Sequence, residues 1–125
     1  MPIGPKGSAF AVPMIRAADV VTPTVQATVD ATFVDVAGST IDALYFQSVS
    51  FTVVNTGAQT IKWKVLGANA SDFSDVVEVQ GSATIVAGAS GSYSTAAAVW
   101  RYYKVQVADN VAASHGAATL RGVAK

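Results

Sequence analysis

Residues 49–66 constrain the fold more than any other part of the chain. They form two runs of alternating apolar and polar residues, VSFTVV and IKWKVL, separated by residues 55–60. Successive side chains of a β-strand point to opposite faces, so each run gives one apolar and one polar face. Asn55 and Gly57 tolerate the backbone angles of a tight reversal. The stretch predicts an antiparallel β-hairpin whose apolar face, anchored by Trp63, packs on the rest of the chain.

Further runs of β-forming residues lie on both sides of this stretch. Segments rich in Gly, Ser, Asn and Ala separate them, a spacing typical of β-sandwiches and barrels. We therefore predict an all-β fold, an antiparallel β-sandwich or flattened barrel of about seven or eight strands. The expected strands lie within residues 25–36, 41–54, 61–66, 76–80, 83–86, 99–107 and 117–123.

Residues 1–24 carry all four prolines of the chain. Proline lacks an N–H group and disfavours helix in the residue before it, so we predict an extended N-terminal arm followed by a sandwich domain at residues 25–125. The arm has more apolar side chains than an ordinary solvated tail. We expect it to dock on its own or a neighbouring subunit, with a frayed terminus as the alternative. Its candidate contact residues are Ile3, Phe10, Val12, Met14 and Ile15.

Composition narrows the range of partners. Eight basic and eight acidic residues balance, without the basic cluster that nucleic-acid binding requires. No apolar run approaches the ~18 residues of a membrane helix, and the N-terminus has no signal-peptide pattern. Charged residues are only 13% of the chain, about half the usual share. Apolar surface is thus expected to be covered by other copies or another protein, unless the chain is a monomer with a small-residue surface.

Candidates for chemistry are few. His115, the single histidine, follows Ser114 in a small-residue turn, and we interpret it as a solvated loop residue rather than a catalytic base. The chain has no cysteine, which leaves zinc without enough ligands. Asp72, Asp75 and Glu78 have a spacing at which carboxylates can share Ca²⁺, but a solvated acidic loop is the preferred interpretation. We expect no catalysis, no cofactor and no metal.

Trp100 and Tyr102 are the remaining candidates for a binding site. By strand alternation they share a face with Lys104 and Gln106. If this face points outward, the two rings form a strip suited to a protein partner or to sugar rings. In the alternative, Trp100 caps the sandwich edge and Tyr102 covers a neighbouring strand.

Three segments carry a resemblance to known proteins: FTVVNTG at 51–57, IKWKVLGAN at 61–69 and WRYYKVQV at 100–107. Together they resemble small β-sandwich proteins of tailed bacteriophages that decorate and stabilise the capsid, over roughly residues 41–125. The resemblance implies a virion structural protein, made in the host cytoplasm, that binds the major capsid protein on the capsid surface as a homotrimer. The last segment also resembles strands of carbohydrate-binding sandwiches. A tail or fibre component, or a carbohydrate-binding module, is therefore the alternative.

Overall fold

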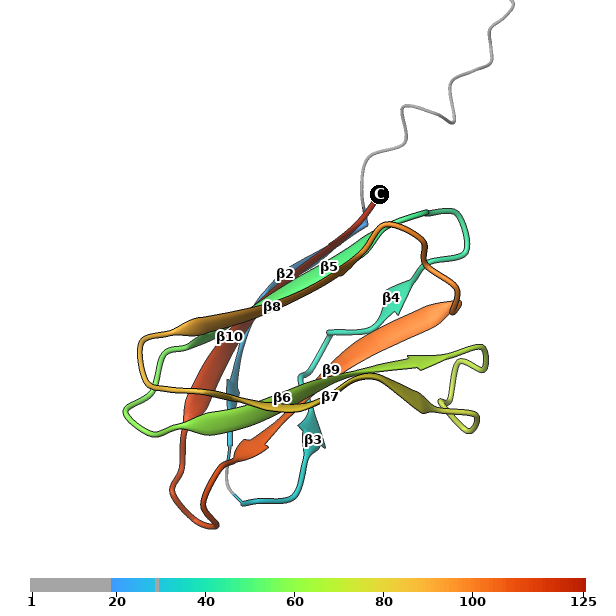
Figure 1. The fold of residues 1–125 in the computed structure, drawn as a ribbon. Coiled ribbons are helices and arrows are strands. Elements are labelled where there is room, and N and C mark those ends of the chain that lie inside the picture. Colours follow the sequence, from blue (N-terminus) through green and yellow to red (C-terminus); the bar gives the residue numbers. More distant parts are fainter. Residues whose placement is uncertain (1–18, 29) are drawn as a thin grey trace, which may run out of the picture.

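The computed structural model describes residues 19–28 and 30–125, which form nine strands in two facing sheets (Figure 1). One sheet has the strand order β2-β10-β5-β8, and the other has the order β3-β9-β6-β7, with β4 also pairing with β9. All pairings are antiparallel, so the predicted β-sandwich is confirmed. The strands are β2 (Asp19–Ala27), β3 (Val34–Asp35), β4 (Ile41–Asp42), β5 (Val49–Asn55), β6 (Ile61–Ala68), β7 (Val77–Ile85), β8 (Ser90–Thr95), β9 (Tyr102–Asp109) and β10 (Ala117–Ala124).

The core lies between the sheets and is built from the alternating runs. In β5 every second residue is buried, and Phe51 is 1% exposed while its neighbour Thr52 is half-buried. The same alternation continues in β6 and β9, where Val65 and Val105 pair across the ladder. Trp63 is 2% exposed, so its predicted role as a core anchor is confirmed. Each large apolar side chain buried here contributes about 1.5–3 kcal/mol.

The predicted hairpin at residues 49–66 is wrong. Strand β5 pairs with β8 and β10, whereas β6 pairs with β7 and β9, so the two runs lie in different sheets. The chain crosses from one sheet to the other between them (Figure 1). Two runs that face each other across a core have the same alternating pattern as two runs side by side on one sheet. The alternation was therefore assigned correctly and the pairing was not.

Asn55 holds this crossing in place. Its side chain is 1% exposed, and its Nδ2 donates to the carbonyl oxygens of Gln59 (2.7 Å) and Ile85 (2.8 Å). Its Oδ1 accepts from the N–H of Gly57 (3.0 Å). Because Ile85 ends β7, the same amide joins the β5–β6 crossing to the β7–β8 crossing. A Cβ atom at Gly57 would lie 2.8 Å from the backbone nitrogen of Ala117, so the turn needs glycine to pack against β10.

Two strand boundaries differ from the prediction. Residues 77–85 form one strand, β7, where two short strands were expected, and register shifts opposite β6 accommodate the irregular segment around Gly81. Strand β2 begins at Asp19, inside the range assigned to the arm, and pairs with β10. Pro23 fits there because β2 is an edge strand, where a missing N–H group interrupts no central ladder. Residues 1–18 lie outside the described residues.

Asp109 closes the end of the sandwich opposite Asp19. It is 0% exposed and accepts hydrogen bonds from the Thr28 hydroxyl and from the N–H groups of His115 (3.1 Å) and Gly116 (3.2 Å). Burial by itself raises the pKa of this carboxyl, but the three donors outweigh it and the pKa lies below its usual value. The carboxylate thereby ties together the ends of β2 and β9 and the start of β10. We call the end that contains Thr28, Asn55, Asp109 and Gly116 the closed end.

Candidate interaction surfaces

The opposite end of the sandwich is where the N-terminal segment attaches. Asp19, the first residue of β2, pairs with Ala124 near the C-terminus. Ala124 in turn pairs with Val49 at the start of β5, and Val49 pairs with Thr95 at the end of β8. Residues 1–18 therefore join the domain beside its C-terminal residue, at the end marked C in Figure 1. We call this the arm-side end.

Two loops meet at the arm-side end and hold each other by backbone hydrogen bonds. The N–H of Ala43 donates to the carbonyl of Arg101 (2.6 Å), and the N–H of Ala98 donates to the carbonyl of Gln47 (2.7 Å). From the core side, the hydroxyl of the buried Tyr103 accepts from two further N–H groups of the loop after β8, at 3.1 and 3.3 Å. The loops are thus fixed by specific contacts on two sides.

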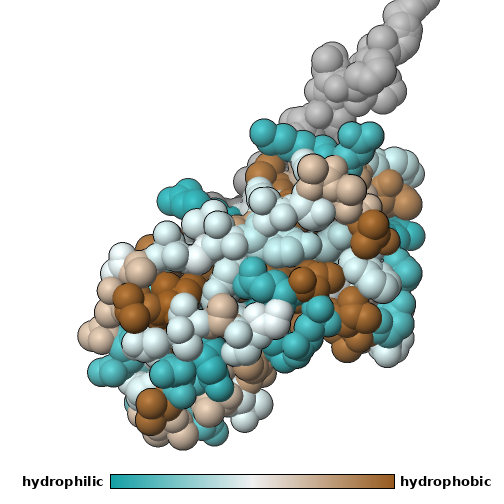
Figure 2. Space-filling view, in the orientation of Figure 1, coloured by the Kyte–Doolittle hydropathy of each residue, from teal (hydrophilic) through white to brown (hydrophobic). Residues whose placement is uncertain are grey.

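These ordered loops expose large apolar side chains. Leu44 and Tyr45, in the loop before β5, are 50% and 76% exposed, and Val99, in the loop after β8, is 75% exposed. Figure 2 shows brown, hydrophobic surface along the right-hand side of the molecule, the side on which Figure 1 draws these loops. Apolar side chains gathered on an ordered surface are typical of an interaction site. The arm-side end is therefore a candidate docking surface.

The sequence left two interpretations of Trp100 and Tyr102 open, an outward aromatic strip or side chains that cover the sandwich edge and a neighbouring strand. Trp100 precedes β9, and its indole lies over Gly67, whose Cβ position would be 2.8 Å from the ring. It packs against the core cluster beside Val79, which matches the alternative in which it caps the sandwich edge. Tyr102 points to the outer face of the second sheet, next to Phe73, with ring centroids 6.3 Å apart. Trp100 departs from the alternation of β9 because it lies in a bend before the strand.

The five arm residues predicted to contact a partner are not among the described residues. They are Ile3, Phe10, Val12, Met14 and Ile15.

The outer face of the second sheet is covered by cations stacked on aromatic rings. The Lys62 and Lys64 ammonium groups lie 5.3 and 4.5 Å from the ring centroid of Phe33. The Lys104 ammonium lies 4.3 Å from the centroid of Phe73, and the guanidinium of Arg101 lies 5.0 Å from that of Tyr102. Such contacts contribute about 0.5–1 kcal/mol each at exposed sites and fix the orientation of long side chains.

Ion pairs complete this face. Lys64 binds Glu78 at 2.9 Å and Lys104 binds Asp35 at 3.0 Å. Burial raises the pKa of Asp35, but hydrogen bonds from Gln106 and Lys104 outweigh it and lower the pKa below its usual value. Both lysine side chains are less than one-fifth exposed. Their ammonium groups are therefore held in defined positions.

A groove of about 480 Å³ is hollowed into this face. The buried side chain of Leu66 contributes to its lining, and the loop between β6 and β7 supplies Phe73. Its polar lining includes Lys64, Glu78, Lys104 and Gln106. The sequence analysis considered Glu78 for calcium and placed Lys104 and Gln106 on the face of Tyr102, but it did not bring these residues together in one groove. The Lys-Trp-Lys alternation in β6 was a further signal, because it places two lysines on one outer face.

The acidic residues considered for calcium have separate local roles. Asp75 accepts from the N–H groups of Asn69 (3.1 Å) and Ala70 (3.0 Å), and Asp72 accepts from the N–H of Ser74 (3.0 Å). The hydrogen bonds from Ser74 lower the pKa of Asp72. Glu78 pairs with Lys64. Across residues 19–28 and 30–125, no group of three His, Cys, Asp or Glu side chains is placed to hold a metal ion.

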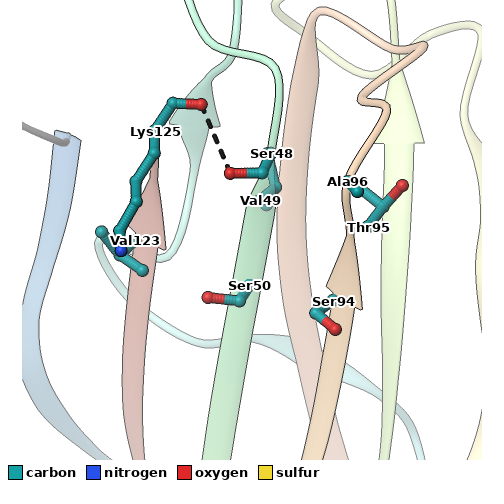
Figure 3. Close-up of a pocket in the computed structure, with 8 residues that line it drawn as sticks. All are labelled: Ser48, Val49, Ser50, Ser94, Thr95, Ala96, Val123 and Lys125. Atoms are coloured by element: carbon teal, nitrogen blue, oxygen red, sulfur yellow. Dashed lines mark hydrogen bonds between the residues drawn. The ribbon is translucent and has the colours of Figure 1, made fainter.

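The outer face of the first sheet has a different chemistry, made of short hydroxyl side chains. Ser50 lies opposite Ser94, and Thr52 lies opposite Ser92, on the paired strands β5 and β8. A hollow of about 260 Å³ lies at the arm-side end of this face, where the Ser48 hydroxyl donates to the carbonyl of Lys125 (3.3 Å) (Figure 3). Arg121, opposite Thr52 on β10, adds a positive charge to this face.

His115 is exposed in the loop before β10, as predicted, with a positive φ of 56°. Only its backbone N–H takes part in the Asp109 network. In the part of the chain that the structure describes, no helix is long and apolar enough to cross a membrane.

Comparisons with known proteins show the fold of this chain. No protein-family profile and no curated sequence matches it. Among solved structures, PirA aligns with a TM-score of 0.55 and 13% identity, covering 78% of this chain and 90% of PirA. The SPBc2 prophage-derived protein YomS aligns with a TM-score of 0.52 and 9% identity, covering 88% of this chain and 96% of YomS. At these identities the similarity establishes a shared β-sandwich fold.

Proposed function

We propose that this chain is a non-enzymatic structural protein of a tailed-phage virion, which decorates and stabilises the capsid as a trimer. In this proposal the N-terminal arm and the arm-side end make the contacts with the major capsid protein and with neighbouring copies. A tail or fibre component is the second form that a virion structural role can take.

The observation that carries the proposal is that the N-terminal arm attaches at the same end of the sandwich as the exposed apolar loops. Residues 1–18 attach at Asp19, at the same end as Leu44, Tyr45 and Val99. Eighteen residues span up to about 60 Å when extended, which is enough to reach a neighbouring subunit. Many identical weak contacts on one shell add up through multivalency, so no single site has to be strong.

Two further observations support a virion role. The FTVVNTG and WRYYKVQV segments resemble phage decoration proteins, and both lie in the folded sandwich as β5 with its following turn and as β9 with its preceding bend. One protein of the same fold, YomS, is prophage-derived by its name.

Pelleting with capsids tests the proposal. Expanded, undecorated capsids of the encoding phage are mixed with the full chain or with a chain lacking residues 2–16, which keeps all of β2. The full chain should pellet with the capsids, and the truncated chain should remain in the supernatant while keeping its β-sheet circular dichroism spectrum. A second variant, Leu44→Ser with Val99→Ser, should also bind more weakly.

Equal capsid binding by the full and truncated chains would remove the arm from the proposal. Absence of binding by the full chain, together with its incorporation into purified tails, would replace decoration with the tail or fibre role.

A further inference from the structure

We propose that the groove on the outer face of the second sheet is a binding site for a neutral saccharide. The site consists of Lys64, Leu66, Phe73, Glu78, Lys104 and Gln106. It is separate from the arm-side loops and does not depend on the virion role, and it borders Tyr102, whose ring centroid lies 6.3 Å from that of Phe73.

The polar groups of the groove are fixed before any ligand arrives. Lys64 is held by Glu78 at 2.9 Å and by the ring of Phe33, and its side chain is 18% exposed. Lys104 is held by Asp35 at 3.0 Å and is 15% exposed. A site with preordered polar groups loses little conformational entropy when it binds.

The charges of the groove favour a neutral ligand. Each lysine already has a carboxylate partner, and Asp72 adds a further negative charge at the rim. An anion would meet Glu78 and Asp72, whereas a cation would meet Lys64 and Lys104. A sugar hydroxyl both donates and accepts, so neighbouring hydroxyls can bond to an ammonium and a carboxylate of one ion pair simultaneously.

The apolar lining suits the C–H face of a sugar ring. Leu66, 6% exposed, and Phe73 both line the groove, and the Lys104 ammonium lies over the Phe73 ring at 4.3 Å from its centroid. Phe73 has a positive φ of 58°, uncommon for an aromatic residue, and its loop is fixed by the hydrogen bonds of Asp72 and Asp75. The backbone therefore presents this ring in a conformation that the loop has to hold in place. The groove volume of about 480 Å³ lies within the range of small-molecule sites, about 300–1,000 Å³.

The test uses the full chain and two probe sets. An array of neutral glycans ending in glucose, galactose or mannose is compared with sialylated and sulfated glycans. The methyl glycoside of the best neutral hit is then titrated into ¹⁵N-labelled protein. We expect binding to at least one neutral class, with the largest amide shifts at Leu66, Phe73 and Gln106.

Two variants separate the groove from other surfaces. Phe73→Gly removes the ring at a position where glycine relieves the positive φ, so the fold is retained. Gln106→Ala removes the amide that lines the groove and donates to Asp35 (2.8 Å). Each should weaken neutral-glycan binding about tenfold or more. Thr52→Ala, on the hydroxyl face, is the matched control and should bind normally. Binding that both groove variants keep, binding of anionic glycans alone, or no glycan binding would overturn the proposal.

Discussion

The loops at the two ends of the sandwich are held in place by different kinds of contact. At the closed end, loops and strand ends are held by buried polar side chains: Asn55 is 1% exposed and Asp109 is 0% exposed. At the arm-side end, loops are held mainly by backbone hydrogen bonds, and large side chains such as Tyr45 point into solvent. The closed end buries its polar side chains, whereas the loops of the arm-side end also expose large apolar ones.

This difference between the two ends suggests that one end stabilises the domain and the other binds a partner. Val86 and Val111 are also exposed near the closed end, but they lie on separate loops. Leu44 and Val99 lie on loops that are bonded to each other. We infer that the closed end carries the stability of the domain and that the arm-side end is built for a partner.

The largest effect is expected at the closed end, from Asp109→Asn. The variant keeps the size of the side chain but replaces one acceptor oxygen by an NH₂ group. A backbone N–H group that donates to Asp109 then loses its acceptor. An unsatisfied buried donor costs about 1–3 kcal/mol, so we expect a loss of about 2–3 kcal/mol in the free energy of unfolding, measured by urea denaturation. Asp30→Asn, at an exposed carboxylate that accepts from the N–H of Ala31 (2.7 Å), is the control. Similar losses in both variants would show that Asp109 has no special role.

Trp100→Ala tests a large side chain that packs against the core at the arm-side end. It removes the indole from Gly67 and the core cluster. Complete truncation of a buried aromatic costs about 3–5 kcal/mol, and because Trp100 is only partly buried we expect about 2 kcal/mol. If unfolding is unaffected and partner binding is lost, Trp100 belongs to a binding strip and the capping assignment is wrong.

Acid should weaken the closed end through Asp109. Its pKa is lower in the folded protein than in the unfolded chain, so its stabilisation is complete above the unfolded pKa and is lost as pH falls through the folded pKa. Hydrogen bonds from Arg101 lower the pKa of Asp42, and the pKa of Asp35 is also low, so these carboxyls add to the loss in the same direction. We expect the free energy of unfolding to fall below about pH 4, and less steeply in Asp109→Asn. Identical acid profiles would contradict this assignment.

The smallest effect on stability is expected from Leu44→Ser combined with Tyr45→Ser. Both side chains are at least half exposed, so the free energy of unfolding should change by about 0.5 kcal/mol or less. Capsid binding should nevertheless fall. Val86→Ser, an exposed residue near the closed end, is the matched control and should change neither property. Equal effects of the two variants on binding would remove the distinction between the ends.

Strand faces were predictable from the sequence because alternation records burial directly. The inward set in β5 and β6 and the burial of Trp63 follow from it. The pairing partners do not, since facing strands and neighbouring strands give the same pattern. The hairpin at residues 49–66 was predicted wrongly for this reason. Residues 55–60 connect the two sheets, and the side-chain amide of Asn55 holds this connection, where the sequence suggested a tight turn.

The polar network around Asp109 and the groove could not be predicted from the sequence, because their residues are far apart along the chain. Thr28 and Asp109 are separated by 81 positions, and Thr28 and Gly116 by 88. The groove combines β6, β7, β9 and the loop of Phe73, and only the sheet register brings them together. No local pattern identifies such sets.

The solution mass of the full chain, measured by light scattering after size exclusion, tests the central claim most directly. If the arm and the arm-side end join copies of this protein, the mass should be near three times the 12.8 kDa of one chain. The chain lacking residues 2–16 should then have the mass of one folded subunit. A full chain that stays at 12.8 kDa at every concentration, or a truncated chain that still forms the trimer, would contradict the account.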